Sequence, residues 1–154
     1  MKLSRKSDYA LRALVTLAGR SGQGHMPIRE LARLNDIPKR FLEQIMLELK
    51  EKGIVRSIAG RIGGFELAMA PEHITMGRIV RIFDEMLAPI PCVSATHYEA
   101  CSQELTCRFR RVLLDIRNYT VKRMEEATLA SIAAGPPVQP KEVFHPQFEF
   151  ADGI

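Results

Sequence analysis

The chain has 154 residues, of which 46% are hydrophobic, so it can bury one core, either as a single domain or as a small domain with an arm. No run of about 18 apolar residues occurs, which excludes a transmembrane helix, and no cleavage-like site follows the basic first residues, so we expect a cytoplasmic protein. Residues 1–81 carry 15 Lys and Arg against 8 Asp and Glu, whereas residues 82–154 carry 7 against 10; this asymmetry indicates either a polyanion-binding first half or merely an unevenly charged surface.

The first predicted elements are three helices. Apolar residues recur at helical spacing over residues 4–19, and Ser4 or Ser7 can cap the start of this helix. A short helix over 28–34, a turn, and a third helix over 38–52 follow. A short helix, a tight turn and a second helix are the helix-turn-helix pattern, which on its own is only moderately specific for DNA binding.

A two-stranded hairpin is predicted directly after the third helix. Gly53 ends that helix, residues 54–58 read as a strand, residues 59–64 as a turn, and residues 65–69 as the returning strand. A hairpin that follows a helix-turn-helix is a wing, and glycines at its tip allow the backbone to approach a phosphate or a groove closely.

Two more helices are predicted in the second half. One covers residues 76–85, after which Pro89 and Pro91 lead into a loop. The other is a single long helix from about residue 104 to 134, and Gly135 ends it. Its apolar seam comprises Leu105, Phe109, Val112, Leu113, Ile116, Tyr119, Met124 and Ala127. One small domain cannot cover so long a stripe, so we expect a homodimer through this helix; the alternative is that the helix lies on its own domain.

The expected fold is therefore mainly α-helical, with a winged helix-turn-helix, a two-stranded β wing and a long C-terminal dimerisation helix. Four parts are expected: a DNA-binding domain over 1–85, a cysteine-containing loop over 86–107, the dimerisation helix over 108–134, and a proline-rich tail over 135–154. Phe144, Phe148 and Phe150 in the tail are candidates for docking.

All three cysteines of the chain, Cys92, Cys101 and Cys107, lie within sixteen residues. An odd number of clustered cysteines in a reducing compartment indicates metal binding or redox chemistry rather than a disulfide framework. An iron–sulfur cluster takes four protein ligands, usually thiolates, so three cysteines leave one position open, and His97 within the loop is a candidate for it. Thiol redox sensing and zinc binding are the alternatives.

Several short motifs resemble the IscR/NsrR/RirA-type family of bacterial regulators over roughly residues 1–134. They are Leu3-Ser4 with Ser7 to Leu14, Ile37-Pro38, Phe41 to Ile45, Gly53 to Val55, Gly63 to Phe65, Leu67-Ala68 and Ile74-Thr75, followed by the three cysteines. The resemblance implies a homodimeric winged-helix transcription factor. It also implies a [4Fe-4S] or [2Fe-2S] cluster that senses iron, redox state or nitric oxide, although some members lack cysteines and respond to a protein partner.

The resemblance suggests Asp8 of the opposite subunit as the fourth cluster ligand; an exogenous ligand, or none, is the alternative. The chain also departs from the family pattern. Ala59 and Arg61 stand where wings often carry Arg and Pro, and Arg110, which cannot ligate, stands where some members have a ligating His. The eight residues between Cys92 and Cys101 resemble the iron-responsive branch.

The predicted DNA contacts lie on the third helix, on the wing and beside them. The first part of a recognition helix enters the major groove, where Gln44 can pair with adenine, Glu43 can accept from cytosine, and Lys39 and Arg40 can bind guanine or phosphate. Arg61 at the wing tip suits a narrow minor groove. Arg5, Lys6 and Arg56 are expected phosphate contacts.

We therefore expect a dimeric DNA-binding regulator, a repressor, that binds a palindromic operator under the control of an iron–sulfur cluster. The alternative is a cluster-free regulator of the same fold, controlled by thiol oxidation or by a protein partner. An enzyme is disfavoured, since no general base stands at recognisable spacing from a cysteine.

Overall fold

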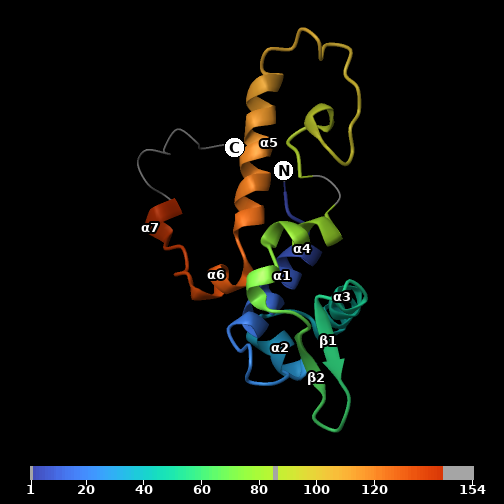
Figure 1. Ribbon diagram of the computed structural model, residues 1–154, viewed down its shortest axis with the longest axis vertical. Coiled ribbons are helices and arrows are strands. Elements are labelled where there is room, and N and C mark those ends of the chain that lie inside the picture. Colours follow the sequence, from blue (N-terminus) through green and yellow to red (C-terminus); the bar gives the residue numbers. More distant parts are fainter. Residues whose placement is uncertain (1, 85–86, 144–154) are drawn as a thin grey trace.

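The computed structural model describes residues 2–84 and 87–143. Figure 1 shows an elongated molecule, with the wing at one end, the cysteine loop at the other, and helix α5 running between the winged domain and that loop. The helices and strands, in chain order, are α1 (Arg5–Ala18), α2 (Ile28–Leu34), α3 (Lys39–Glu51), β1 (Val55–Ile58), β2 (Gly64–Leu67), α4 (Met76–Phe83), α5 (Arg110–Glu126), α6 (Leu129–Ala134) and α7 (Pro140–Val143), with 3-10 turns η1 (Pro71–His73) and η2 (Pro91–Val93). The mainly α-helical winged helix-turn-helix is confirmed.

The helix-turn-helix is built by caps and by one apolar face. Of the two candidate caps for α1, Ser4 is used: its Oγ accepts a hydrogen bond from the Ser7 backbone N–H at 3.2 Å. The buried face of α3 comprises Leu42, Ile45, Met46 and Leu49, each 0% exposed. Gly53 lies just after α3 and has a φ of +68°. This left-handed conformation favours glycine and ends the helix.

The wing is an antiparallel pair, in which Val55 lies opposite Leu67 and Ile58 opposite Gly64. An isolated bridge between Met26 and Phe65 joins the wing to the segment before α2, with reciprocal backbone hydrogen bonds of 2.9 Å. A Cβ atom at Gly64 would clash with the Met26 carbonyl, so this close approach requires glycine. The wing is thereby held at its base and leaves Arg61 exposed near its tip.

The expected single helix over 104–134 is wrong: it begins later and is interrupted. The chain leaves helical geometry at Ala127 (ψ 98°) and Thr128 (ψ 156°). The Met76 N–H donates to the Ala127 carbonyl and the Leu129 N–H to the Ile74 carbonyl, both at 2.8 Å. These tertiary bonds replace helical ones, and Thr128 caps α6 by accepting from the Ser131 N–H at 3.1 Å. Helix α6 then packs on α1, and its Leu129 joins the core of the winged domain.

The predicted fourth helix also ends earlier, at Phe83, and Asp84 follows it in extended conformation. The carboxylate of Asp84 accepts from the Ser4 backbone N–H at 3.2 and 3.3 Å, which ties the end of α4 to the start of α1. The predicted docking residues Phe144, Phe148 and Phe150 lie outside the described residues. No helix in the described part of the chain is long and apolar enough to cross a membrane.

Glu125 joins α5 to the winged domain. Its carboxylate accepts a hydrogen bond from the Arg81 guanidinium and another, at 3.1 Å, from the Thr75 hydroxyl. Gly77 faces this carboxylate, and a Cβ there would require the Glu125 side chain to shift. The hydrogen bond from Arg81, supported by that from Thr75, lowers the pKa of Glu125 from its ordinary value of 4.5.

Replacing Glu125 by glutamine is expected to remove a pH-dependent part of the stability. Because the folded-state pKa lies below the unfolded value, the carboxylate stabilises the fold fully above about pH 4.5, and the contribution is lost as the pH falls through the folded pKa. Since 38% of the side chain is exposed, we expect no more than about 1 kcal/mol at neutral pH. Urea unfolding at several pH values would measure it; a difference between the two proteins that persists unchanged at pH 3 would contradict this origin.

Candidate functional site

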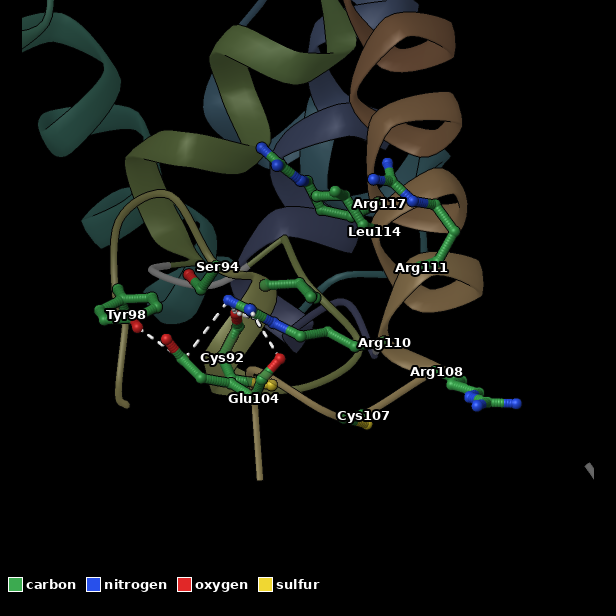
Figure 2. Close-up of a pocket in the computed structure, with 11 residues that line it drawn as sticks. Cys92, Ser94, Tyr98, Glu104, Cys107, Arg108, Arg110, Arg111, Leu114 and Arg117 are labelled. Atoms are coloured by element: carbon green, nitrogen blue, oxygen red, sulfur yellow. Dashed lines mark hydrogen bonds and ion pairs between the residues drawn. The ribbon is translucent and has the colours of Figure 1, made fainter. Parts of the chain in front are cut away.

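A basic cavity of about 580 Å³ lies where the cysteine loop meets the start of α5. Cys92 and Cys107 line it together with Arg110 and Glu104, whereas Cys101 does not (Figure 2). Cys92 lies in η2, which Pro91 begins and Pro89 precedes, and it is only 9% exposed. Cys101 is exposed, and Cys107 is half-buried. The three cysteines are free thiols.

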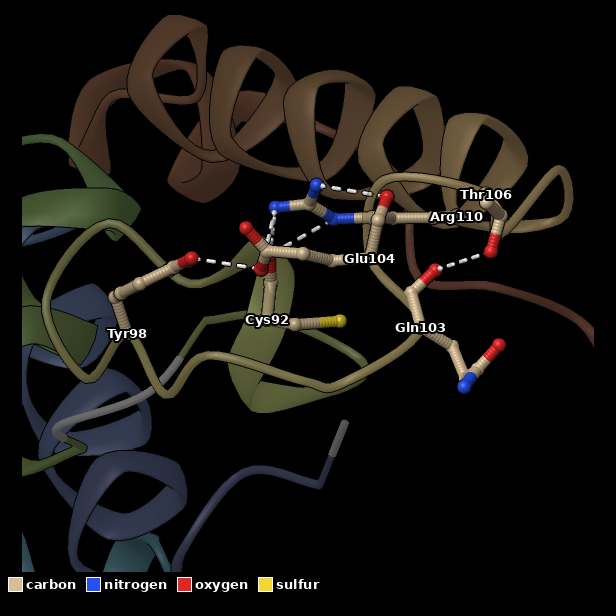
Figure 3. Close-up of polar contacts among 6 residues, drawn as sticks. All are labelled: Cys92, Tyr98, Gln103, Glu104, Thr106 and Arg110. Atoms are coloured by element: carbon tan, nitrogen blue, oxygen red, sulfur yellow. Dashed lines mark hydrogen bonds and ion pairs between the residues drawn. The ribbon is translucent and has the colours of Figure 1, made fainter.

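Arg110 connects the two ends of the loop. Its Nη2 and Nε donate to the Cys92 carbonyl at 2.8 and 3.2 Å, its Nη1 donates to the Glu104 carbonyl at 3.4 Å, and Nη2 lies 3.5 Å from the Glu104 carboxylate (Figure 3). From the sequence, Arg110 was identified only as a residue that cannot ligate iron. Its position three residues after Cys107 was the available signal, but its role as the loop's internal tie depends on the fold.

Tyr98 closes the same network. Its hydroxyl donates to the Glu104 carboxylate at 2.7 Å. This hydrogen bond lowers the pKa of Glu104, to which the positive charge of Arg110 also contributes, and it raises the pKa of Tyr98. Glu104 therefore stays ionised beside Arg110 over the physiological range, and Tyr98 stays protonated as the donor.

Replacing Arg110 by alanine is expected to raise the alkylation rate of Cys92 by about tenfold or more, because the Cys92 carbonyl loses two charge-assisted hydrogen bonds, each worth about 1.5–3 kcal/mol, and η2 opens. Iodoacetamide labelling under anaerobic conditions, quantified for each cysteine by peptide mass spectrometry, measures the rate. Exposed Cys101 is the internal standard, and Arg111→Ala is the matched control. Equal Cys92 rates in the two variants would contradict the role of Arg110.

The cavity fits an anionic cluster, because it is basic and because the thiols of Cys92 and Cys107 line it. The three cysteines are not brought together there, since Cys101 lies outside it. Within residues 2–84 and 87–143, no three His, Cys, Asp or Glu side chains are close enough together to hold a metal ion. Ligation by all three cysteines therefore requires the loop to bring Cys101 toward Cys92 and Cys107. Of the arginines that line the cavity, Arg110 is directed into it, whereas Arg108 points away (Figure 2).

Neither candidate for the fourth ligand lines this cavity, and both have contacts elsewhere. Asp8 is on α1, where its carboxylate accepts from Arg12 at 2.7 and 3.0 Å, and its side chain is 44% exposed. Ligation by Asp8 of the opposite subunit, which the family resemblance suggests, would compete with this ion pair. The His97 ring lies 3.2 Å from the Thr96 hydroxyl, and its backbone N–H donates to Ser94 at 2.9 Å. It does not line the cavity.

The outer face of α3 presents the predicted base-reading residues to solvent. Arg40 and Gln44 are exposed, and Lys39 forms an ion pair of 3.1 Å with Glu43 one turn further on. This pair neutralises Glu43, which on its own would repel DNA. Leu47 shares the face and is 55% exposed, although the sequence analysis did not single it out. No periodicity marks it, because one apolar residue on a polar face is unremarkable in sequence.

The predicted phosphate contacts differ in what surrounds them. Arg5, and Arg61 on the wing, are exposed. Lys6 pairs with Glu48 of α3 at 2.8 Å, and Arg56 pairs with its cross-strand neighbour Glu66 at 2.7 Å. Lys6 and Arg56 therefore already neutralise carboxylates of the protein. Binding to phosphate would compete with these ion pairs, and the phosphate contacts of both residues stay a prediction.

Two residues of the predicted apolar seam, Leu105 and Ala127, lie outside α5, and the others divide between two faces. Leu113 and Met124 turn inward, whereas Phe109, Val112, Ile116 and Tyr119 form a stripe that is 47–68% exposed. The spacing of three, four and three residues is that of a coiled-coil seam. We call these four residues the α5 stripe. Large apolar side chains gathered on one exposed face indicate an interaction surface.

Comparisons with known proteins agree with this architecture. Residues 3–135 match the family model described as Rrf2, iron-dependent transcriptional regulator. A putative rrf2-like transcriptional regulator of Rhodobacter capsulatus is 37% identical over 142 residues, which is 88% of this chain and 95% of that one. The transcriptional regulator NsrR of Geobacillus kaustophilus is 31% identical over 86% of this chain and 89% of that one. The solved structure of CymR, the global cysteine regulator of B. subtilis, has a TM-score of 0.77 at 28% identity and covers 89% of this chain and 99% of that chain.

Proposed function

Because the chain belongs to the Rrf2 family of transcriptional regulators, we propose that it is a homodimeric, operator-binding repressor whose DNA affinity is set by an iron–sulfur cluster on Cys92, Cys101 and Cys107. The observation that carries this proposal is the basic cavity lined by Cys92 and Cys107 where the cysteine loop meets the start of α5. A group bound there would contact both the loop and α5, the helix that is proposed to form the dimer.

The residues around the cavity suit a thiolate-bound cluster, [4Fe-4S] or [2Fe-2S], which carries net negative charge. Arg110 supplies compensating positive charge and fixes the backbone of Cys92. Asp8 of the opposite subunit is our proposed fourth ligand, and His97 is the alternative. When bound, the cluster supplies reversible, oxidant-sensitive iron–sulfur bonds; its potential and lability depend on local charge, hydrogen bonding and exposure.

A chain of contacts leads from the loop to the recognition helix. Asp84, shortly before the loop, holds the Ser4 N–H at the start of α1. Lys6, on the first turn of α1, pairs with Glu48 of α3. A shift of the loop that moves Asp84 would therefore change the position of α1 and, through Lys6, that of α3. In a dimer this changes the separation of the two recognition helices, which must match two half-sites on the operator.

DNA binding is assigned to the exposed faces of α3 and the wing. Arg40, Gln44 and the paired Lys39 and Glu43 are proposed to contact base edges, and Arg61 the minor groove. The remaining predicted contacts to phosphate are Arg5, Lys6 and Arg56. The α5 stripe is proposed as the dimer interface, since its heptad-like spacing fits a second copy of the same helix.

Anaerobic reconstitution with iron and sulfide tests the proposal. The wild-type protein should take up both elements, develop visible absorption, and change its affinity for an operator selected in vitro by about 5–150-fold, which is the usual range of coupling between two sites. Cys92→Ser, Cys101→Ser and Cys107→Ser should remove uptake, Asp8→Ala should weaken it, and Ser102→Ala is the matched loop control. Uptake of neither element, with unchanged operator binding, would overturn the cluster.

The alternative is a regulator of the same fold that responds through its thiols or a partner protein. It is favoured by the similarity to CymR, whose description concerns cysteine, whereas the family description concerns iron. The same preparation distinguishes the two. An iron-free protein whose operator affinity changes on oxidation with hydrogen peroxide, and is restored by dithiothreitol, supports thiol sensing instead.

A further inference from the structure

A second, smaller cavity lies between the end of α4, the first part of the loop and the inner face of α5. It has a volume of about 180 Å³. Its apolar wall is formed by Leu87, Ala88, Ala95 and Val121. Arg117 and Ser94 line both this cavity and the cysteine cavity. We call it the Arg117 cavity.

Arg117 has an unmet hydrogen-bonding requirement. Its Nε is buried and has no hydrogen-bond partner among the described residues. The other arginine of this cavity, Arg81, donates to Glu125, and Arg110 is satisfied by Cys92 and Glu104. Figure 2 shows Arg117 extending from α5 away from Cys92 and Cys107. A buried charged donor without a partner is costly, and an anion bound in the cavity would give this guanidinium a partner.

The composition of the cavity selects the class of that group. The Arg117 guanidinium matches a carboxylate in charge and geometry. The Ser94 hydroxyl accepts from the His97 N–H at 2.9 Å, which leaves its own hydrogen to donate. Arg81 and Thr96 also line the cavity, and the aliphatic side chains of the remaining wall suit a short hydrocarbon chain.

We propose that the Arg117 cavity binds a small aliphatic monocarboxylate, with its carboxylate on Arg117 and its chain against Leu87, Ala95 and Val121. This site shares Arg117 and Ser94 with the wall of the cysteine cavity, but it does not depend on a bound cluster. A ligand there contacts α4, the loop and α5 together, so it stabilises one arrangement of the winged domain relative to α5. It thereby gives the regulator a second input, through a metabolite, at the same junction.

Methyl-detected NMR titration of the full-length, iron-free protein with acetate, butyrate and hexanoate tests this inference, with butanamide and n-butylamine as neutral and cationic controls. Butyrate or hexanoate should shift the methyl signals of Leu87 and Val121 saturably, and the amide and amine should not. Arg117→Met should weaken binding by about tenfold or more, because it removes a charge-assisted hydrogen bond. Arg111→Met, the same change at an exposed position of the same helix, should bind as the wild type does.

Val121→Phe provides a second variant that fills the cavity and leaves the charge unchanged. It should lose carboxylate binding while it keeps the circular dichroism and oligomeric state of the wild type. The inference is overturned if no carboxylate shifts these methyl signals at about millimolar concentration or below, the affinity expected of a ligand with few atoms. Equal binding of butanamide and butyrate, or equal losses in Arg111→Met and Arg117→Met, would also overturn it. None of these outcomes bears on iron uptake, so the cluster proposal is tested separately.

Discussion

Replacing Val112 and Ile116 together by aspartate is expected to convert the protein to a monomer and to lower its affinity for a two-half-site operator by at least about 100-fold. Both side chains lie in the α5 stripe and are 58% and 47% exposed. Burying two carboxylates against their copies would cost far more than the apolar contact they replace. The operator affinity falls because the second half-site is then bound from free solution instead of at the high effective concentration within a dimer.

Light scattering after size-exclusion chromatography measures the dimer, and fluorescence anisotropy with an operator selected in vitro measures DNA binding. Asn118→Asp combined with Lys122→Asp is the matched control, since both residues are exposed on α5 outside the stripe. The control should remain dimeric. A double variant in the stripe that stays dimeric with full operator affinity would show that the subunits associate elsewhere.

Replacing Leu129 by alanine is expected to destabilise the protein by about 2–5 kcal/mol, the usual cost of such a truncation in a core. Leu129 is 0% exposed and belongs to the core shared with α1 and α3. Its backbone N–H donates to the Ile74 carbonyl, so backbone and side chain both hold α6 on the winged domain. Had the long helix continued as the sequence predicted, Leu129 would lie far from this core and the cost would be small.

Urea unfolding measures the change in the free energy of unfolding, provided that the protomer concentration is the same for each variant, because the proposed dimerisation would contribute to the apparent stability. Leu105→Ala is the matched control: it makes the same chemical change at a position that is 95% exposed. That control should change the stability by less than about 0.5 kcal/mol. Equal effects of the two substitutions would contradict the placement of α6.

In the cysteine loop, the sequence indicates which segment carries the candidate site but not how its side chains are arranged. The spacing of Cys92, Cys101 and Cys107 identified the segment, because clustered thiols in a short loop have few other uses. The structure places two of them at one cavity and leaves Cys101 outside it. Side-chain direction in a loop depends on contacts such as Arg110 with the Cys92 carbonyl, which no local pattern encodes.

What the sequence determined by itself is the order of elements from α1 to the wing and the existence of an apolar seam on the later helix. These features follow from periodicity, caps and turn residues, all of which act over a few neighbouring residues. Thr128 is a residue type that often caps helices, as it does for α6. The helical periodicity on both sides of it nevertheless predicted one continuous helix instead of the break between α5 and α6. Only the tertiary structure decided that break, since it depends on backbone pairing between residues 74–76 and 127–129, and only the tertiary structure brought Arg117 to an apolar cavity. Contacts between segments so distant in the chain depend on how the whole core packs, which local patterns do not specify.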